Sequence, residues 1–554
     1  MTYCIFKRLL CAVWMLSLSS AFSLDFNDPG SPKELAAAIE KAMTDEQALA
    51  QVFMLGWVGA EPSPLIIEWI RQRNIGGVKI FGWNTADTQR LARTVGELQE
   101  ISLRSPFRIP LFIATDQEGG WIRHVKGSTS ETPGNMAIGA SGYPRDAYLS
   151  GYYIGKELAL IGINMNFAPS VDLFISRDSE LIGPRAFGSD PVRAGILGSA
   201  FAKGQLATGV IPTAKHYPGH GGTDLDSHGT LPEINAPFEI IWDRELIPYR
   251  MLTSEGLPVI MSGHIAFPMT EAARTPASLS AWFLRDVLRN KIGFNGVVIT
   301  DDLMMIGATS YLGSLPQTAK QALIAGNDII LFSSTPYLND QIWTVLINSM
   351  RTEESFRQVV RTSARRILEL KLQYLRGSAS VPYIPDLKRV ETEIPDPEGS
   401  AFFLNLAARS VTIVKPAPAN SVFPIKREEA GKVLLAGRYD DFFTYGIMAF
   451  PGADIYKYAY TSRLNVNEIV SRARNSDTVI FCLSDAFDLR LLQNLQELGK
   501  KVIVLSVLSP VHVESVPWVT GAVAVYSYAP ESFASGFSAI IGRIPAEGTL
   551  PYDW

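Results

Sequence analysis

The chain has 554 residues, of which 47% are hydrophobic and 19% are charged, and its formal net charge is −5. This length exceeds an ordinary domain of about 150 residues, although one (β/α)₈ barrel can take about 250 residues or more. The charges are mixed along the chain and form no concentrated basic stretch, so the composition argues against nucleic acid as a partner.

The N-terminus has the pattern of an export signal. Two basic residues precede an apolar run, residues 9–18, which ends in small residues around Ala21 and Ser23. This order is typical of a signal peptide, and the run is too short to span a bilayer core of about 30 Å. We therefore expect residues 1–23 to be a signal peptide on an exported protein, periplasmic or extracellular, whose mature chain has no stable membrane span.

Two alternatives concern this segment. Residues 9–18 could form a buried first helix, or Cys11 could carry a lipid and make the protein a lipoprotein, although the preceding Arg8-Leu9-Leu10 matches a lipidation signal poorly. Removal of the signal leaves Cys482 as the one cysteine, so no disulfide can form within the mature chain and stability must come from a large core.

From about residue 31 to residue 375, a short apolar run, a polar cluster and a helical stretch recur in that order. The runs lie at 76–83, 110–120, 163–173, 210–220, 258–268, 296–303 and 327–334. Such short apolar runs are typical of buried parallel strands. Their repeated alternation with helices predicts an α/β fold and favours a (β/α)₈ TIM-like barrel over residues 24–376. A doubly wound sheet is the alternative, but its glycine fingerprint is not found.

The rest of the chain predicts a second unit. Residues 377–400 are rich in proline and charge, as a linker would be. Residues 401–554 hold further apolar runs with helical segments between them, which is typical of an open parallel sheet. We therefore expect a smaller C-terminal α/β sandwich domain, and we find no catalytic cluster in its sequence.

Polar side chains follow the predicted barrel strands, where this fold keeps its chemistry. They are Asp116, Glu118, Asp172, Lys215, His216, His264, Asp301 and Asp302. Each alone could be a helix cap, a turn former or a satisfied polar group under a loop. Together they predict an active site at the carboxyl ends of the strands.

The stretch "KHYPGHGGTDLDSH", residues 215–228, holds three of the six histidines. With Asp224 or Asp226 these histidines could supply zinc ligands. However, Pro218 and Gly219 break any helix that would align two of them, and no cysteine or second histidine cluster supports a metal. We expect no metal and no cofactor.

Acid–base catalysis explains the same stretch better. Asp226 and His228 are two positions apart, so an extended loop would point both to one side, and the carboxylate would fix the tautomer of the imidazole. The glycines nearby would give the loop freedom to move. Asp301, at a strand end, could act as a carboxylate nucleophile, as in retaining glycoside hydrolysis. A histidine, with a pKa near 6.5, could serve as the proton donor.

The stretch resembles the K-H-F-P-G-H-G-x₄-D-S-H signature of glycoside hydrolase family 3, in its two-domain β-N-acetylhexosaminidase branch. "DQEGG" at 116–120, "GPRAFGSDP" at 183–191 and "GFNGVVITDDL" at 293–303 match three further motifs in the order of the family. The resemblance covers residues 31–375 well and the second domain loosely.

The resemblance implies a role for each matching residue. Asp301 would be the nucleophile, His228 the general acid/base and Asp226 its dyad partner. The sugar hydroxyls would be held by Asp116, Arg185, Lys215 and His216, and His220 would be structural.

One departure from the family concerns the residues after "DQEGG". The family continues R-V-x-R, whereas this chain has Trp121-Ile122-Arg123-His124. His124 occupies the place of the substrate-binding arginine and Arg123 lies one position earlier. Both are therefore candidates for substrate binding.

The resulting hypothesis is an exported, cofactor-free, retaining exo-β-N-acetylhexosaminidase. Its partner would be a carbohydrate with terminal β-linked N-acetylglucosamine, from peptidoglycan fragments or from chito- or glycan oligosaccharides. The alternatives are a glycoside phosphorylase using the same site, a β-glucosidase-type family 3 hydrolase, a metal-dependent hydrolase that a chelator would inactivate, and a non-catalytic sugar-binding protein. The oligomeric state is not determined by the sequence.

Overall fold

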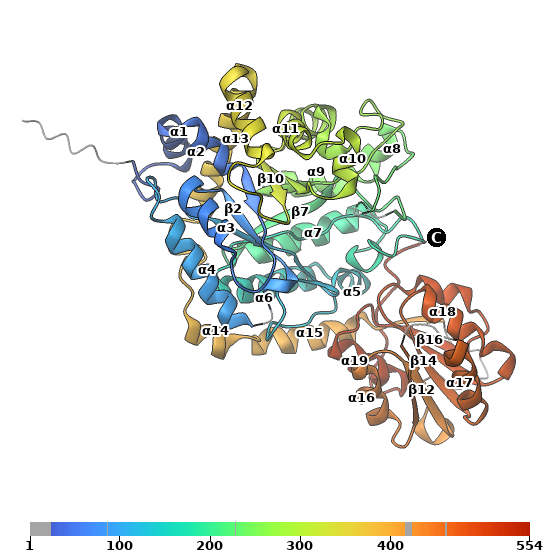
Figure 1. Cartoon of the computed structure of the whole chain (residues 1–554). Coiled ribbons are helices and arrows are strands. Elements are labelled where there is room, and N and C mark those ends of the chain that lie inside the picture. The colour runs from blue at the N-terminus through green and yellow to red at the C-terminus, as the bar shows by residue number, and fades with distance from the viewer. Residues whose placement is uncertain are drawn as a thin grey trace, which may run out of the picture.

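The computed structural model describes residues 24–85, 87–225, 227, 229–415, 424–459 and 463–553. The predicted signal peptide, residues 1–23, lies outside these ranges, and so do Asp226 and His228. No helix of the described residues is long and apolar enough to cross a membrane. Two sheets, each with its own helices, organise the described chain (Figure 1).

The first sheet is a closed, wholly parallel barrel of eight strands, in the order β1-β10-β9-β8-β7-β6-β3-β2. Its strands are β1 (Phe53–Leu55), β2 (Gly77–Ile80), β3 (Phe112–Thr115), β6 (Met165–Asn166), β7 (Ile211–Tyr217), β8 (Val259–Ser262), β9 (Val297–Asp302) and β10 (Ile329–Phe332). The predicted barrel is confirmed, and each of the seven apolar runs contains one strand of the barrel. The eighth strand, β1, is three residues long and follows α2 (Asp45–Gln51) with one residue between them, so its sequence is continuous with a helical pattern.

Helices surround the barrel (Figure 1). They are α1 (Pro32–Ala42), α2, α3 (Pro64–Glu68), α4 (Thr88–Ser102), α5 (Asn135–Ser141), α6 (Pro144–Ile161), α7 (Pro191–Leu206), α8 (Phe238–Asp243), α9 (Leu246–Ser254), α10 (Ile306–Leu312), α11 (Leu315–Ala325), α12 (Gln341–Thr352) and α13 (Glu354–Tyr374), with π-helical segments at Trp69–Arg73 and Trp282–Ile292. The first two helices begin with side-chain caps: the Ser31 hydroxyl accepts from the Glu34 N–H, and Thr44 with Gln47 forms a capping box.

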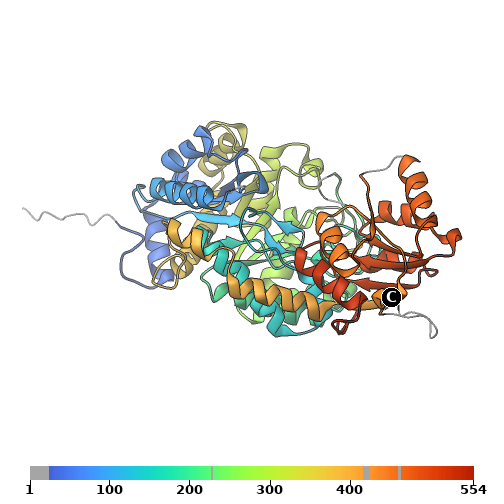
Figure 2. The same cartoon turned by 90° about the horizontal axis from the view of Figure 1, so that it is seen from below.

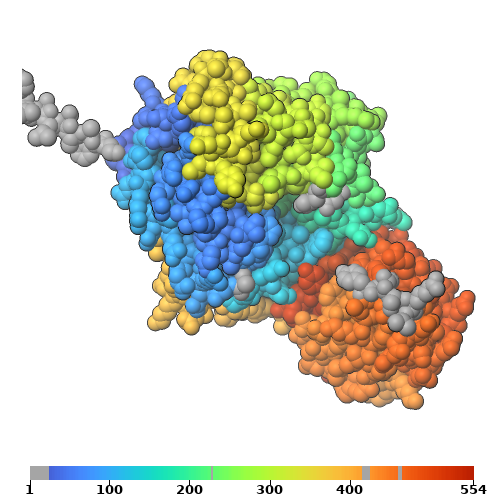
Figure 3. Space-filling view, viewed as in Figure 1, coloured from blue at the N-terminus to red at the C-terminus, as the bar shows by residue number. Residues whose placement is uncertain are grey.

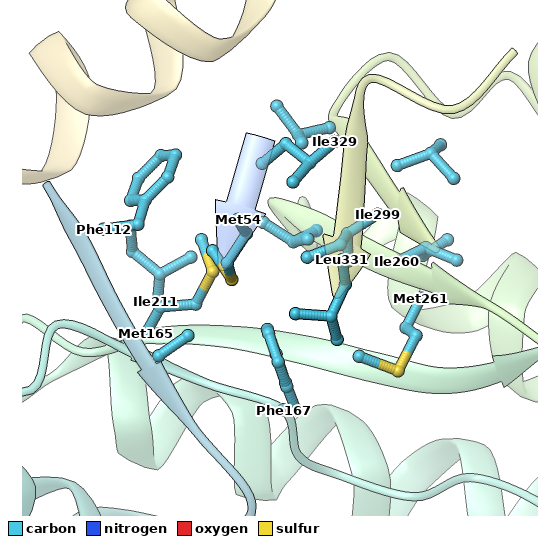
Figure 4. Close-up of a cluster of buried hydrophobic side chains, with 14 of the residues drawn as sticks. Met54, Phe112, Met165, Phe167, Ile211, Ile260, Met261, Ile299, Ile329 and Leu331 are labelled. Carbon is cyan, nitrogen blue, oxygen red and sulfur yellow. The ribbon is translucent and has the colours of Figure 1, made fainter. Parts of the chain in front are cut away.

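The barrel interior is packed with apolar side chains. Met54, Phe112, Met165 and Ile211 lie together there, with side chains from β8, β9 and β10 (Figure 4). This filling is what makes such a barrel a core and not a pore. Polar groups are consequently confined to the strand ends.

The second sheet has six strands in the order β11-β16-β15-β14-β12-β13. They are β11 (Thr412–Lys415), β12 (Val433–Gly437), β13 (Asp454–Lys457), β14 (Thr478–Leu483), β15 (Lys501–Ser506) and β16 (Gly521–Ala524), with α16 (Asp440–Ala449), α17 (Arg463–Arg474), α18 (Ala486–Gln493) and α19 (Pro530–Ile540) around them. The expected parallel sheet is confirmed for β12 to β16, while β11 pairs antiparallel with β16. The edge strand β13 escaped sequence analysis because three of its four residues are exposed.

Two helices connect the sheets along one side of the barrel (Figures 1 and 2). The segment expected to be a linker contains α14 (Leu387–Glu393) and the first residues of α15 (Pro397–Ser410). Buried Glu157 of α6 accepts hydrogen bonds from the N–H of Asp396 at 2.9 Å and from the N–H of Ser130 at 2.8 Å. These bonds fix the connecting segment on the barrel.

The second domain forms a separate lobe against the barrel (Figure 3). The two lobes share a buried apolar cluster that includes Met136 and Phe174 of the barrel and Tyr526 and Tyr552 of the C-terminal part. The C-terminal tail returns to the barrel, where the carbonyl of Pro551 accepts from the N–H of Ser189 at 3.0 Å. The tail therefore joins the two domains.

Candidate functional site

The site begins at the carboxyl end of β3, where Asp116 follows the last strand residue. Its carboxylate forms ion pairs with Lys79 of β2 and Lys215 of β7. The β2–β3 pairing sets Lys79 opposite Ala114, so closure of the barrel brings the two lysines to one carboxylate from different strands. All three side chains are buried.

A second carboxylate lies beside the first. Glu118, in β4 (Gln117–Gly119), accepts two hydrogen bonds from Arg185, from Nε at 2.9 Å and from Nη2 at 2.8 Å. Lys215 Nζ lies 2.7 Å from the same carboxylate. Arg185 ends a 3₁₀ turn, and its carbonyl accepts from the side chain of Asn135 at 2.8 Å. The bidentate pair therefore fixes the plane of Glu118.

The charges of this network stabilise one another. Burial alone would raise the pKa of Asp116, but Lys215 and Lys79 hold it well below its usual range. Burial is likewise outweighed at Glu118, whose pKa Arg185 and Lys215 lower. Burial would lower the pKa of Lys215, yet the two carboxylates raise it. The network is therefore ionised at neutral pH, with N–H donors and carboxylate oxygens at the barrel mouth.

His216 is oriented by Asp172. Its Nδ1 lies 2.6 Å from Asp172 Oδ2, and its Nε2 lies 3.3 Å from Arg185 Nη2. Since Arg185 can only donate, this pattern assigns the proton to Nδ1 and leaves Nε2 as an acceptor. Asp172 also accepts from the N–H of His220 at 2.7 Å. Burial would raise the pKa of Asp172, but His216 and the surrounding donors lower it.

Asp301 lies at the end of β9, at the same barrel mouth. Its Oδ1 accepts from the N–H of Asp302 at 2.8 Å. Burial opposes its charge, but the imidazoles of His216 and His264 and the Asp302 N–H hold the pKa of Asp301 below its usual range. An ionised carboxylate at this position is suited to nucleophilic attack.

Asp302 has a different part in the same strand end. Its Oδ1 accepts from the N–H of Met304 at 3.0 Å and from the N–H of Ser333 at 3.1 Å. His264 Nε2 donates to the Asp302 carbonyl at 3.0 Å. Asp302 therefore fixes the turn that presents Asp301.

The predicted catalytic loop is described except at Asp226 and His228. The carbonyl of Ser227, between them in sequence, accepts from the N–H of Gly307 at 3.0 Å, which ties the loop to the start of α10, just after β9. The glycines at the base of the loop allow close packing. A Cβ on Gly221 would lie 1.6 Å from the Leu173 carbonyl oxygen, and one on Gly219 would lie 2.9 Å from Glu245.

The structure separates the two candidates that follow "DQEGG". His124 Nδ1 lies 3.6 Å from Asp116 Oδ2, and burial lowers the pKa of His124 to about 4. Arg123 points elsewhere: its Nη1 donates to the Thr129 carbonyl at 2.8 Å and its Nη2 to Glu131 at 2.8 Å. Neutral His124 is the one that lies beside the network.

Sequence analysis did not select Lys79. Its ammonium lies 4.1 Å from the centre of the Phe81 ring, and Phe81 stacks on Trp83 at 4.6 Å between ring centres. The half-exposed Trp83 is held by a 2.7 Å hydrogen bond from its indole to the Trp57 carbonyl. The available signal was a single lysine in the otherwise apolar run "GGVKIF" near a strand end.

No group of three or more histidine, cysteine, aspartate or glutamate side chains that could hold a metal ion occurs among the described residues. What the strand ends offer is a set of paired carboxylates, ammonium groups and a guanidinium. Such groups bind hydroxyls in both directions, as donors and as acceptors.

The polar network lies at the carboxyl-terminal face of a parallel barrel, where barrel enzymes have their active sites, and its donors and acceptors are suited to hydroxyl groups. Residues 45–370 match the family model described as "Glycosyl hydrolase family 3 N terminal domain". The chain therefore belongs to glycosyl hydrolase family 3 and is a glycoside hydrolase.

Similar proteins carry consistent names. Beta-hexosaminidase A of Pseudoalteromonas piscicida is 31% identical over 404 residues, which cover 65% of this chain and 67% of that protein. A beta-hexosaminidase of Tolumonas auensis is 37% identical over 281 residues, covering 50% and 81%. The solved family 3 beta-N-acetylglucosaminidase of Paenibacillus sp. is 28% identical, with a TM-score of 0.83, and the match covers 92% of this chain and 99% of that one.

Proposed function

We propose that the protein is a retaining exo-β-N-acetylhexosaminidase that removes terminal β-linked N-acetylglucosamine from peptidoglycan fragments or from chito- or glycan oligosaccharides. The observation that carries the proposal is Asp301, an ionised carboxylate at the end of β9 beside His216 and the Asp116–Lys215 network. The names of the similar proteins support the choice of sugar.

The network would hold the terminal sugar. Each lysine has three N–H donors. Lys79 directs a donor at Asp116, and Lys215 directs donors at both Asp116 and Glu118. The remaining donors and the carboxylate oxygens of Asp116 can bind adjacent hydroxyls. His216 and Arg185 would complete this sugar subsite, with His124 in place of an arginine.

The reaction would proceed in two displacements. The Asp301 carboxylate attacks the anomeric carbon as the glycosidic C–O bond breaks, and His228 gives its proton to the departing oxygen, so the leaving group departs as an alcohol. In the second step His228 takes a proton from water, whose oxygen attacks the anomeric carbon and releases Asp301. Asp226 would hold the imidazole in the required tautomer. The Ser227 carbonyl accepts a hydrogen bond from the N–H of Gly307, which lies six residues after Asp301 in the sequence. This bond supports an approach of the loop to the nucleophile.

The first test compares release of nitrophenol from the β-N-acetylglucosaminide and from the β-glucoside. Preference for the N-acetyl sugar is expected, and preference for the glucoside would favour the β-glucosidase alternative. Incubation with a slow fluorinated N-acetylglucosaminyl donor, followed by peptide mass spectrometry, should place the covalent sugar on Asp301. A label on another residue would contradict the mechanism.

The role of His228 can be isolated from substrate binding. His228→Ala should slow hydrolysis of substrates with poor leaving groups far more than that of activated aryl glycosides, because only the former need protonation. Wild-type kcat/KM should also fall as pH rises through the pKa of the acid, and this fall should vanish in the variant on activated substrates. Equal losses on both substrates would remove His228 from the acid role.

Phosphate could replace water in the second displacement, which would make the enzyme a phosphorylase. A beta-glucoside phosphorylase shares the fold at a TM-score of 0.80, but at 19% identity this likeness concerns the fold alone. Adding phosphate to the assay and measuring sugar 1-phosphate decides between the two acceptors.

We also propose export, supported by the order of charged, apolar and small residues in positions 1–23. A mature protein that begins at Leu24 is the expected product. A lipidated N-terminus at Cys11 would identify the lipoprotein alternative instead.

A further inference from the structure

A cavity of about 180 Å³ lies between the two domains, apart from the Asp116 network. Its walls combine barrel residues with residues of the second domain that follow β14 and β15. The barrel supplies Trp121, Ser179 and Pro184, and the second domain supplies Ser484, Asp485 and Ser509. Neither domain encloses the cavity by itself.

The second domain contributes the part of its sheet where ligands usually bind. Its parallel strands, taken in chain order as β12 to β16, have the spatial order 2-1-3-4-5, so the order reverses between β12 and β14. Open α/β sheets bind ligands outside the carboxyl ends of strands beside such a reversal. Ser484 follows β14, one of the two strands beside the reversal, and Ser509 lies in the segment after β15; the lining contains no residue from the segment after β12.

Three polar atoms around the cavity have no hydrogen-bond partner within the described part of the chain. They are Trp121 Nε1, Ser179 Oγ and Ser509 Oγ. Ser179 is 2% exposed and Ser509 is 9% exposed. Each buried polar group without a partner costs about 1–3 kcal/mol, so a ligand that supplied partners to these three atoms would offset that cost.

The chemistry of the walls selects a neutral, hydroxyl-rich ligand. Trp121, Ser179 and Ser509 belong to the lining, while two charged residues of the lining are already paired, Arg177 with Glu514 at 2.9 Å and Asp485 with Arg438. Mixed charges do not favour a phosphate. A sugar ring fits this set, because its hydroxyls donate and accept and its C–H face can stack on an aromatic ring.

The cavity adjoins the sugar network through shared segments. Trp121 lies in the turn between β4, which carries Glu118, and β5 (Ile122–Arg123). Pro184 precedes Arg185, the bidentate partner of Glu118. A ligand in the cavity therefore touches the segments that carry both partners of this pair.

We infer that the interdomain cavity is a second saccharide-binding site, built by the barrel and the C-terminal domain together. Its ligand is a sugar ring, either of the oligosaccharide being cleaved or of a separate saccharide. The inference rests on the proposed function for the choice of N-acetylglucosamine as the probe.

The test is calorimetric titration of the full-length Asp301→Asn protein with N-acetylglucosamine and with tri-N-acetylchitotriose. If the ring belongs to the bound oligosaccharide, Trp121→Ala and Ser179→Ala/Ser509→Ala each weaken the trimer about 10-fold or more relative to the monosaccharide. If it is a separate saccharide, the monosaccharide fills two sites and the same variants leave one. Ser150→Ala removes another buried, unpartnered hydroxyl, on α6 and outside the cavity, and should match the parent.

Trp121→Phe guards against a folding defect, because it keeps an aromatic ring and removes only the N–H. Unchanged binding of both saccharides in all cavity variants would overturn the inference. The proposed function fails separately: wild-type protein would then not release nitrophenol from the β-N-acetylglucosaminide, whatever the titration shows.

Discussion

Both domains gather charged side chains at the carboxyl ends of parallel strands, but the two clusters have opposite electrostatic character. At the barrel mouth, two lysines converge on Asp116 and its pKa lies well below the usual range. In the second domain, Asp488 is buried next to Asp485, and both share Arg438. Burial, together with the charge of Asp485, raises the pKa of Asp488.

The difference follows from geometry. A closed barrel directs eight strand ends toward one axis, so cations from non-adjacent strands β2 and β7 reach the same carboxylate. In the open sheet, β12 and β14 are neighbours, so Arg438, which follows β12, pairs with both Asp485 and Asp488, which follow β14. Tyr458 then donates to Asp488 at 2.9 Å and Ser484 N–H donates to it at 3.0 Å, which anchors the cluster locally. In the barrel cluster three cations surround Asp116 and Glu118, which suits it to a ligand, whereas the other cluster has a structural role.

The largest expected effect concerns the nucleophile. Asp301→Asn should lower kcat/KM by roughly 10⁴-fold or more, because the covalent route is lost. Asp488→Asn, the matched change in the other cluster, should leave kcat/KM within about 2-fold. Steady-state assays on the aryl N-acetylglucosaminide measure both, and comparable losses would break the distinction between the two clusters.

The part that the cations around Asp116 play is tested at Lys79. Lys79→Leu should lower kcat/KM about 10- to 100-fold, as expected for loss of one or two charge-assisted hydrogen bonds to substrate and Asp116. His124 lies 3.6 Å from the same carboxylate, so Lys79→Leu/His124→Arg should recover part of the loss by restoring a cation. Lys457→Leu removes an exposed ion pair in the second domain and should have no effect on the same assay. A double variant no better than the single one would exclude this compensation.

The free energy of unfolding should fall by a few kcal/mol more when a carboxylate is replaced in the barrel cluster than in the second-domain cluster. Glu118→Gln leaves Arg185 and Lys215 short of a buried carboxylate and should cost about 3–5 kcal/mol in the free energy of unfolding. Asp488→Asn should cost about 1 kcal/mol, because an amide oxygen can still accept from Ser484. Urea unfolding at pH 7 compares them. Equal costs would mean that charge balance does not set the stability of either cluster.

The smallest effect is the pH dependence of stability, and its sign differs between the clusters. The lowered pKa values of Asp116 and Glu118 stabilise the fold above their unfolded pKa values, near 4, and this contribution is lost as pH falls. The raised pKa of Asp488 acts oppositely: stability falls as pH rises from about 4 through the folded pKa. Asp488→Asn should therefore flatten only the second trend in unfolding curves recorded from pH 4 to 8. An unchanged profile would contradict the raised pKa.

The sequence by itself determined the local structure and the chemical inventory of this protein. Apolar runs bounded by polar clusters located seven of the eight barrel strands, because burial on both faces of a parallel strand requires that pattern. The resemblance to the family motifs implied a common role for Asp116, Arg185, Lys215 and His216, and the structure brings all four into one network.

Only the tertiary structure decided which side chains meet. Lys79 reaches Asp116 because β2 and β3 pair in one register, and His124 and Arg123, adjacent in sequence, point to different partners. Close packing requires Gly221, and the interdomain cavity needs residues more than 300 positions apart. Such contacts depend on barrel closure and domain docking, which no short stretch of sequence encodes. Periodicity and spacing describe neighbours along the chain, whereas these contacts join residues that are neighbours only in space.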